Sequence, residues 1–252
     1  MKHLVANDPG DPGDRRSVVL ALTLIVGLAF LLGLPALRIG LLSDAWVVLG
    51  ISQESLVAPI GHHRIPLLNT AALAMWKAFG THGARYQALN LALFAAVACL
   101  VFRTGRTILG RFEPALLAAL LFAASATYYE VYCWPVIGNM NSLATGLAVL
   151  ALLAARRAAL GEGRRWSWIF AGLALAAHWT YELTAPTLVV GSAWILLGSW
   201  RSRQTWRHNA IAATARLWPA ALAVVAIFAV RLAWPHPSLG TASLLDYPLF
   251  RF

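Results

Sequence analysis

The chain has 252 residues, of which 60% are apolar and only 12% are charged. Soluble domains are roughly half apolar and about a quarter charged, so this composition excludes an ordinary soluble protein and predicts an integral membrane protein. The net charge of +10 does not indicate nucleic-acid binding, because the arginines gather in short gaps between apolar runs. That distribution is typical of the cytoplasmic loops of membrane proteins.

The chain opens with the polar, turn-rich sequence "NDPGDPGD", and residues 1–16 are predicted to form a disordered cytoplasmic tail. The apolar run 17–37 follows this tail. It is longer than the apolar core of about 7–15 residues in a signal peptide, and no Ala-x-Ala cleavage site follows it. We therefore interpret it as a first transmembrane helix that anchors the chain.

The rest of the chain predicts an all-α, polytopic membrane protein with about seven transmembrane helices, since each span needs about 20 mainly apolar residues. The predicted spans are 17–37, 84–102, 114–129, 138–155, 166–181, 183–200 and 213–233. The first outer loop, 38–83, contains "AWVVLGI" and "LLNTAALAMWKAFG", which are too short to span. We expect amphipathic helices there, lying in the membrane interface. The transmembrane module is thus 17–233, and residues 234–252 form an outer C-terminal segment.

The Lys and Arg residues predict the orientation of these spans. With the N-terminus in the cytoplasm, fourteen of the twenty lie in inner segments and six in outer ones. This bias agrees with the positive-inside rule. It predicts that the long first loop faces the periplasm of a bacterium or the lumen of a eukaryotic organelle. Because eighteen of the twenty basic residues are Arg, as is typical of GC-rich bacterial genomes, we expect the bacterial inner (plasma) membrane.

Half of the ten acidic residues fall on the outer side in this topology: Asp44, Glu54, Glu130, Glu182 and Asp246. Carboxylates close to hydrocarbon are costly and usually face a bundle interior or a water-filled cavity. Asp44, just beyond the first span in "LLSDAW", is the strongest functional candidate. Other polar and aromatic residues accompany the outer carboxylates, namely His62, His63, Arg64, Tyr129, Trp134, Asn139 and His178. Such a set suits a sugar-binding cleft, because hydroxyls bond to carboxylates and sugar C–H faces stack on aromatic rings.

Each of these residues has a simpler interpretation. Trp and Tyr gather at both membrane interfaces in many membrane proteins, and His62 and His63 fit a solvated loop. His178 and Glu182, four residues apart, could share a helix face and hold a metal, although such a pair alone is weak evidence. The sequence contains no Walker loop, no H-E-x-x-H and no dinucleotide-binding glycine pattern, so a soluble nucleotide has no evident site.

The order of several motifs resembles that of the GT-C superfamily of membrane glycosyltransferases, in particular the bacterial relatives of protein O-mannosyltransferases. These motifs are Asp44 after the first span, "HHRIPLLNTAALAMWKAFG" before the second, Asn90 in "YQALNLALF", "ALLFAASATYYEVYCWPVIGN" and "HWTYEL". Three positions depart from the family pattern. Ile65 separates Arg64 from Pro66, Ser125-Ala126 stands where His-Pro is usual, and Tyr181 stands where Lys is usual. The resemblance covers roughly residues 17–200.

The resemblance implies transfer of a sugar from a polyprenyl phosphate-linked donor to an acceptor on the outer face. No cofactor is expected, and no metal is strictly required, because the leaving phosphate departs well when it is paired with a cation. Asp44 is then the general base, and Arg64 with its neighbours His62 and His63 binds the leaving phosphate. Glu130 and Glu182 orient hydroxyl groups of the sugar or the acceptor.

Two other functions remain open. One is a non-catalytic subunit that binds lipid-linked sugars, and the other is a small transporter. The transporter is disfavoured because the charged residues lie at span ends and not at the midplane. Family members usually have further spans, so this chain could be a minimal member, one part of a complex in which a partner subunit supplies the missing spans, or a truncated and inactive copy. The sequence does not identify the sugar, the lipid or the acceptor.

Overall fold

The computed structural model describes residues 12–38, 40–41, 43–54, 66–125, 134–200 and 205–233. Every regular element within these ranges is helical, which confirms the predicted all-α fold. Four helices are long and apolar enough to cross a membrane. They are α1 (Pro12–Gly33, continued by the 3-10 turn η1, Leu34–Arg38), α4 (Gly83–Leu109), α7 (Pro135–Leu160) and α10 (Trp206–Ala233).

Three further helices coincide with the remaining predicted spans but are shorter. These are α5 (Phe112–Ala123), α8 (Arg165–Thr180) and α9 (Pro186–Ser199), with 12, 16 and 14 residues. At 1.5 Å per residue they extend about 18–24 Å, whereas the hydrocarbon core of a bilayer is about 30 Å thick. The structure therefore supports four of the seven predicted spans, and the other three remain a prediction.

The first helix begins earlier than the sequence predicted. Pro12 starts α1, so residues 12–16 belong to the helix and not to a disordered tail. Asp14 lies in the first turn, where a negative charge interacts favourably with the helix dipole. The rest of the predicted tail, residues 1–11, and the C-terminal segment 234–252 lie outside the described residues.

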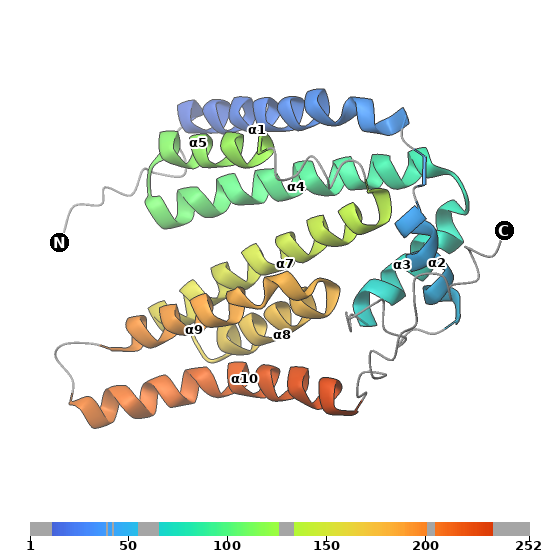
Figure 1. Cartoon of the computed structure of the whole chain (residues 1–252). Helices are drawn as coiled ribbons and strands as arrows, with labels where there is room; N and C mark the ends of the chain where they lie inside the picture. The colour runs from blue at the N-terminus through green and yellow to red at the C-terminus, as the bar shows by residue number, and fades with distance from the viewer. Residues whose placement is uncertain are drawn as a thin grey trace.

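The helices form a bundle in which α7 runs diagonally between two groups (Figure 1). α1, α4 and α5 pack together on one side, while α8, α9 and α10 pack together on the other. α7 contacts α4 from the first group and both α8 and α9 from the second. We call the end where α4 and α7 begin the outer end, after the predicted topology, and the end where they finish the inner end.

Small residues allow these helices to approach closely. A Cβ on Gly198 of α9 would lie 2.6 Å from the Cβ of Ala159 on α7. A Cβ on Gly105 of α4 would lie 3.1 Å from that of Ala115 on α5. Close backbone packing of this kind drives association of helices in membranes, where the hydrophobic effect between helices is weak.

The two predicted loop helices are present as α2 (Ser43–Glu54) and α3 (Pro66–Phe79), and both dock on the outer end of the bundle (Figure 1). Their apolar faces form one buried cluster with the beginnings of α4 and α7. The cluster includes Leu49 of α2, Leu68 of α3, Tyr86 of α4 and Val136 of α7, each at most 3% exposed. α2 and α3 thus bury their apolar faces against protein, and their position in the membrane interface remains a prediction.

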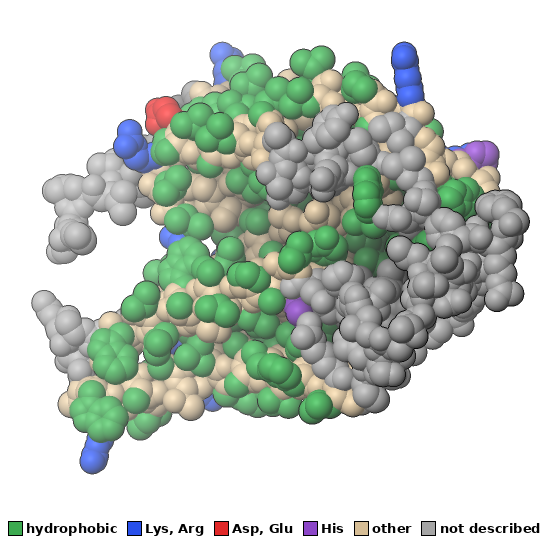
Figure 2. Space-filling view, in the orientation of Figure 1, with side chains coloured by type: hydrophobic (Ala, Val, Ile, Leu, Met, Phe, Trp, Pro, Cys, Tyr) green, Lys and Arg blue, Asp and Glu red, His purple; other side chains and the backbone are tan. Residues whose placement is uncertain are grey.

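Large apolar side chains also cover the outside of the bundle (Figure 2). Leu20, Leu197 and Leu232 are 70%, 73% and 79% exposed. A water-soluble protein rarely exposes so much contiguous apolar surface. Together with the four long apolar helices, this surface makes the chain an integral membrane protein.

Candidate functional site

The candidate site is the outer end, where α2 carries Asp44 in its first turn. α2 starts soon after the end of the first span, and the connection between them passes directly over the beginning of α4. A Cβ on Gly83 would lie 3.0 Å from both the Cα of Gly40 and the backbone nitrogen of Leu41. A side chain at position 83 would crowd this backbone, so the glycine allows the connection to lie close against the beginning of α4. The carboxylate of Asp44 itself lies outside the described part of the structure.

The buried face of α2 holds the helix in place. Ala45, Val48 and Leu49 are 3%, 4% and 1% exposed and pack in the cluster that joins α2, α3, α4 and α7. The ring of Trp46 meets that of Trp76 of α3 edge to face, with 6.1 Å between centroids. Asp44 therefore follows a stretch of chain that lies close against Gly83 and precedes a residue buried in the core.

The beginning of α7 carries two predicted site residues, Trp134 and Asn139. Trp134 precedes the helix and is 40% exposed, so its ring is available to a ligand or to lipid. Asn139 is fully buried, and its Nδ2 donates to the carbonyl of Tyr86 on α4 at 3.0 Å and to that of Pro135 at 2.6 Å. These contacts of Nδ2 position α7 against α4, and the substrate contact of Asn139 stays a prediction.

Asn139 belongs to a group of buried polar residues between α4 and α7 that the sequence analysis largely missed. The Tyr86 hydroxyl donates to the Gly80 carbonyl at 2.9 Å, and the Ser142 hydroxyl donates to Asn90 Oδ1 at 3.3 Å. Gln87 is also buried, at 2% exposed. The sequence did contain a sign of this polar contact, because Tyr86, Gln87 and Asn90 lie in the first two turns of a mainly apolar span. Polar side chains at that depth indicate contacts between helices.

The end of α8 brings His178 to the same end of the bundle. His178 is 4% exposed and lies in the last turn of the helix. α8 ends at Thr180, Tyr181 is extended (φ −156°, ψ 117°), and Glu182 begins a separate 3-10 turn, η3 (Glu182–Thr184). The prediction that His178 and Glu182 share a helix face is therefore wrong. The turn follows from the sequence, because Pro186 starts α9 four residues later and needs a break before it.

Five predicted site residues lie outside the described residues: His62, His63, Arg64, Tyr129 and Glu130. Residues 55–65 lie between α2 and α3 in the chain, and residues 126–133 lie between α5 and α7. Glu182 lies within η3, but its side chain is not described. Of the predicted site, the structure thus brings together the first turn of α2, the beginning of α7 and the end of α8.

The charged side chains that are described at the outer end are cations. Arg38, Lys77 and Arg85 are exposed there. The described residues contain no group of three or more His, Cys, Asp or Glu side chains that could hold a metal ion. The described part of the site thus contains the aromatic ring of Trp134, the buried His178 and the N-terminus of α2.

Comparisons with known proteins do not assign the chain to a family. No family model, no curated protein and no solved structure matches it.

Proposed function

We propose that this protein is a membrane glycosyltransferase that transfers a sugar from a polyprenyl phosphate-linked donor to an acceptor at the outer end of the bundle. The position of Asp44 is the observation that carries the proposal. It lies in the first turn of a helix that immediately follows a membrane-crossing helix and is packed against the starts of two others. The motif order that resembles GT-C enzymes gives this position its expected role.

The proposed chemistry needs a base and a cation. The Asp44 carboxylate accepts the proton of the acceptor hydroxyl while that oxygen attacks the anomeric carbon. The bond between this carbon and the phosphate oxygen breaks with inversion, and polyprenyl phosphate leaves with the bonding electrons. Arg64 pairs with the phosphate, because a planar guanidinium matches two phosphate oxygens at once.

The surroundings of Asp44 support the role of a base. The N-terminus of α2 adds a positive electrostatic contribution that favours the ionised carboxylate. The exposed Trp134 supplies an aromatic face on which a sugar could stack. Fourteen of the twenty Lys and Arg residues fall on the opposite side of the predicted topology, which supports an outer-facing, periplasmic site.

The test is sugar transfer by the purified chain in proteoliposomes that contain a polyprenyl phosphate-linked sugar. Asn keeps the shape of Asp but cannot act as a base, so Asp44→Asn should lower turnover by about two to four powers of ten. Binding of the donor should change little, because the phosphate is held by Arg64.

Glu54→Gln is the matched control, because it neutralises a carboxylate at the other end of the same helix, about 15 Å away at 1.5 Å per residue. It should retain the turnover of the wild type. Full activity of Asp44→Asn would remove Asp44 from the reaction. Donor binding without transfer by the wild type would favour a non-catalytic subunit that binds lipid-linked sugars.

A further inference from the structure

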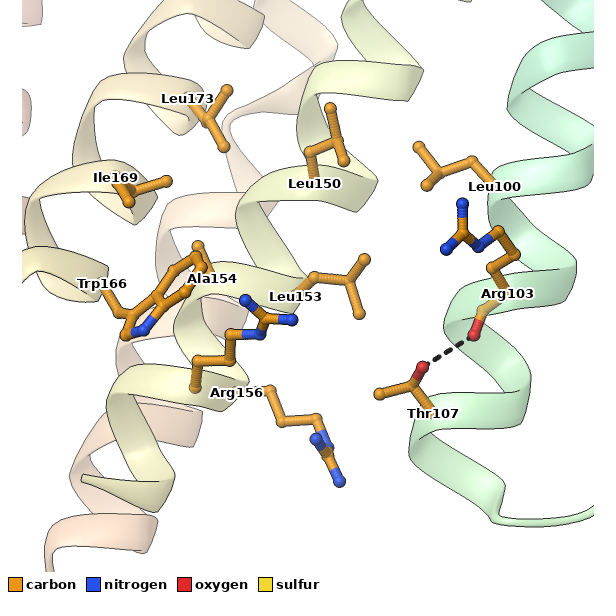
Figure 3. Close-up of a pocket in the computed structure, with 11 residues that line it drawn as sticks. Leu100, Arg103, Thr107, Leu150, Leu153, Ala154, Arg156, Trp166, Ile169 and Leu173 are labelled. Carbon is orange, nitrogen blue, oxygen red and sulfur yellow. Dashed lines mark hydrogen bonds between the residues drawn. The ribbon is translucent and has the colours of Figure 1, made fainter. Parts of the chain in front are cut away.

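A groove between α4, α7 and α8 opens at the inner end, far from the candidate site (Figure 3). Its volume is about 390 Å³. Figure 2 shows the surface hollowed at this end, between α4 and the helices on the other side of α7. The proposed transfer reaction does not use this groove.

Each of the three helices contributes a stripe of residues spaced by three and four positions. The stripes are Leu100, Arg103 and Thr107 on α4, Leu150, Leu153 and Arg157 on α7, and Trp166, Ile169 and Leu173 on α8. α4 and α7 run toward the inner end and α8 runs away from it. In all three stripes the leucines or isoleucine therefore lie nearer the membrane centre, and the arginines, threonine or tryptophan lie nearer the inner end.

The arginines of the groove differ in how they are neutralised. Arg157 lies 3.9 Å from a Glu162 carboxylate oxygen and stacks on the Trp166 ring at 4.3 Å. Arg103 and Arg156 also line the groove, one from each facing helix, and neither forms an ion pair within the described part of the chain. Figure 3 shows Arg103 of α4 and Leu153 of α7 directed into the space between the two helices, with Arg156 one turn further along α7 toward the inner end.

We propose that this groove binds one anionic phospholipid from the leaflet at the inner end. Arg103 and Arg156 hold the phosphate headgroup. The leucines and the isoleucine of the three stripes, which lie nearer the membrane centre, contact the start of an acyl chain. Basic pockets between membrane helices on the cytoplasmic side are suited to such headgroups. The gradient from charge to leucine along the groove matches a phospholipid, whereas a free phosphate would use only its lower part.

The test compares phosphatidylglycerol and phosphatidylcholine by native mass spectrometry of the full chain in detergent. The affinity for the first bound lipid is measured for each. The wild type should prefer phosphatidylglycerol by about tenfold, equivalent to about 1.4 kcal/mol. The double variant Arg103→Gln/Arg156→Gln should lose this preference. Inorganic phosphate should not displace the lipid, because it lacks the acyl chain.

Two controls separate a specific site from a general attraction of positive charge to anionic lipid. Arg111→Gln/Arg164→Gln removes the same charge from exposed positions at the inner end that do not line the groove, and it should keep the preference. Leu153→Trp leaves every arginine in place but fills the groove, and it should weaken binding of both lipids. If that variant does not give a folded protein, Leu153→Phe serves the same purpose.

The proposal is overturned if the wild type binds both lipids equally or if the control pair loses the preference as fully as the groove pair. It is also overturned if a folded groove-filling variant binds phosphatidylglycerol as the wild type does, or if inorganic phosphate displaces the lipid.

Discussion

The outer and inner ends of the bundle differ in how their polar and charged side chains are accommodated. At the outer end, α2 and α3 cover the starts of α4 and α7, and the buried polar side chains there are neutral amides, hydroxyls and a histidine. At the inner end, arginines lie on exposed turns and meet acids in two described ion pairs, Arg106 with Asp14 and Arg157 with Glu162.

The difference follows from the free energy of desolvation. A buried neutral amide needs only hydrogen-bond partners, whereas a buried charge needs a paired charge as well. The end that reaches water and headgroups can therefore hold arginines, whereas the buried polar side chains described at the covered end are all neutral amides, hydroxyls or histidine. The comparison predicts that the outer end depends mainly on packing, while single charges at the inner end contribute little to folding.

The largest effect on stability is expected from removing packing at the outer end. Leu68 of α3 is 3% exposed in the cluster that fixes α2, whereas its neighbour Leu67 is 37% exposed. Leu68→Ala should reduce the free energy of unfolding by about 2–5 kcal/mol, because it removes buried methyl groups and leaves a cavity. Leu67→Ala should cost much less. Thermal unfolding in detergent measures both, and equal losses would mean that α3 does not dock through this face.

A smaller effect, on ligand binding, is expected at the segment between α2 and α3. Arg64→Ala should weaken binding of a polyprenyl phosphate-linked sugar roughly tenfold or more, since a charge-assisted hydrogen bond contributes about 1.5–3 kcal/mol. Arg64→Lys should recover only part of the affinity, because an ammonium group cannot form the planar fork. Equal donor binding by the wild type and both variants would show that Arg64 only reaches toward the membrane interface.

The smallest effect is expected at the inner end. Arg106 Nη2 donates to both carboxylate oxygens of Asp14, at 3.0 and 3.1 Å, and the two side chains are 29% and 23% exposed. Arg106→Gln should lower the free energy of unfolding by only about 0.2–1 kcal/mol, as is usual for exposed pairs. The loss should shrink further in high salt. A loss as large as that of Leu68→Ala would contradict the comparison between the two ends.

Several features of the fold could be predicted from the sequence because they depend on local composition. Apolar runs indicated a helix at each of the seven predicted spans and at two places in the first outer loop, and a helix is present at every one. The predicted lengths of the helices were less reliable, because an apolar run does not show where a helix ends. The run 166–181 continues through His178, but the backbone leaves the helix at Tyr181 to allow Pro186 to start α9.

The candidate site also combines features that the sequence indicated with features that only the structure shows. Sequence alone indicated Asp44, since a carboxylate directly after an apolar span is costly unless it faces a polar cavity or a bundle interior. It also grouped His178 and Glu182 on one helix face, which is wrong because that pairing depends on an unbroken helix. Only the tertiary structure assigned Asn139 to the contact between α4 and α7, because Tyr86 lies 53 positions earlier in the chain.

By itself the sequence determined that this is an all-helical membrane protein with most of its basic residues at one end, because hydrophobicity and charge are properties of each residue. The tertiary structure decided which polar residues are buried between helices and which arginines face the groove, because these depend on how α4, α7 and α8 approach one another. α7 meets α8 through buried alanines and α4 at Gly146, and the positions of these small residues in a single sequence do not reveal their partners.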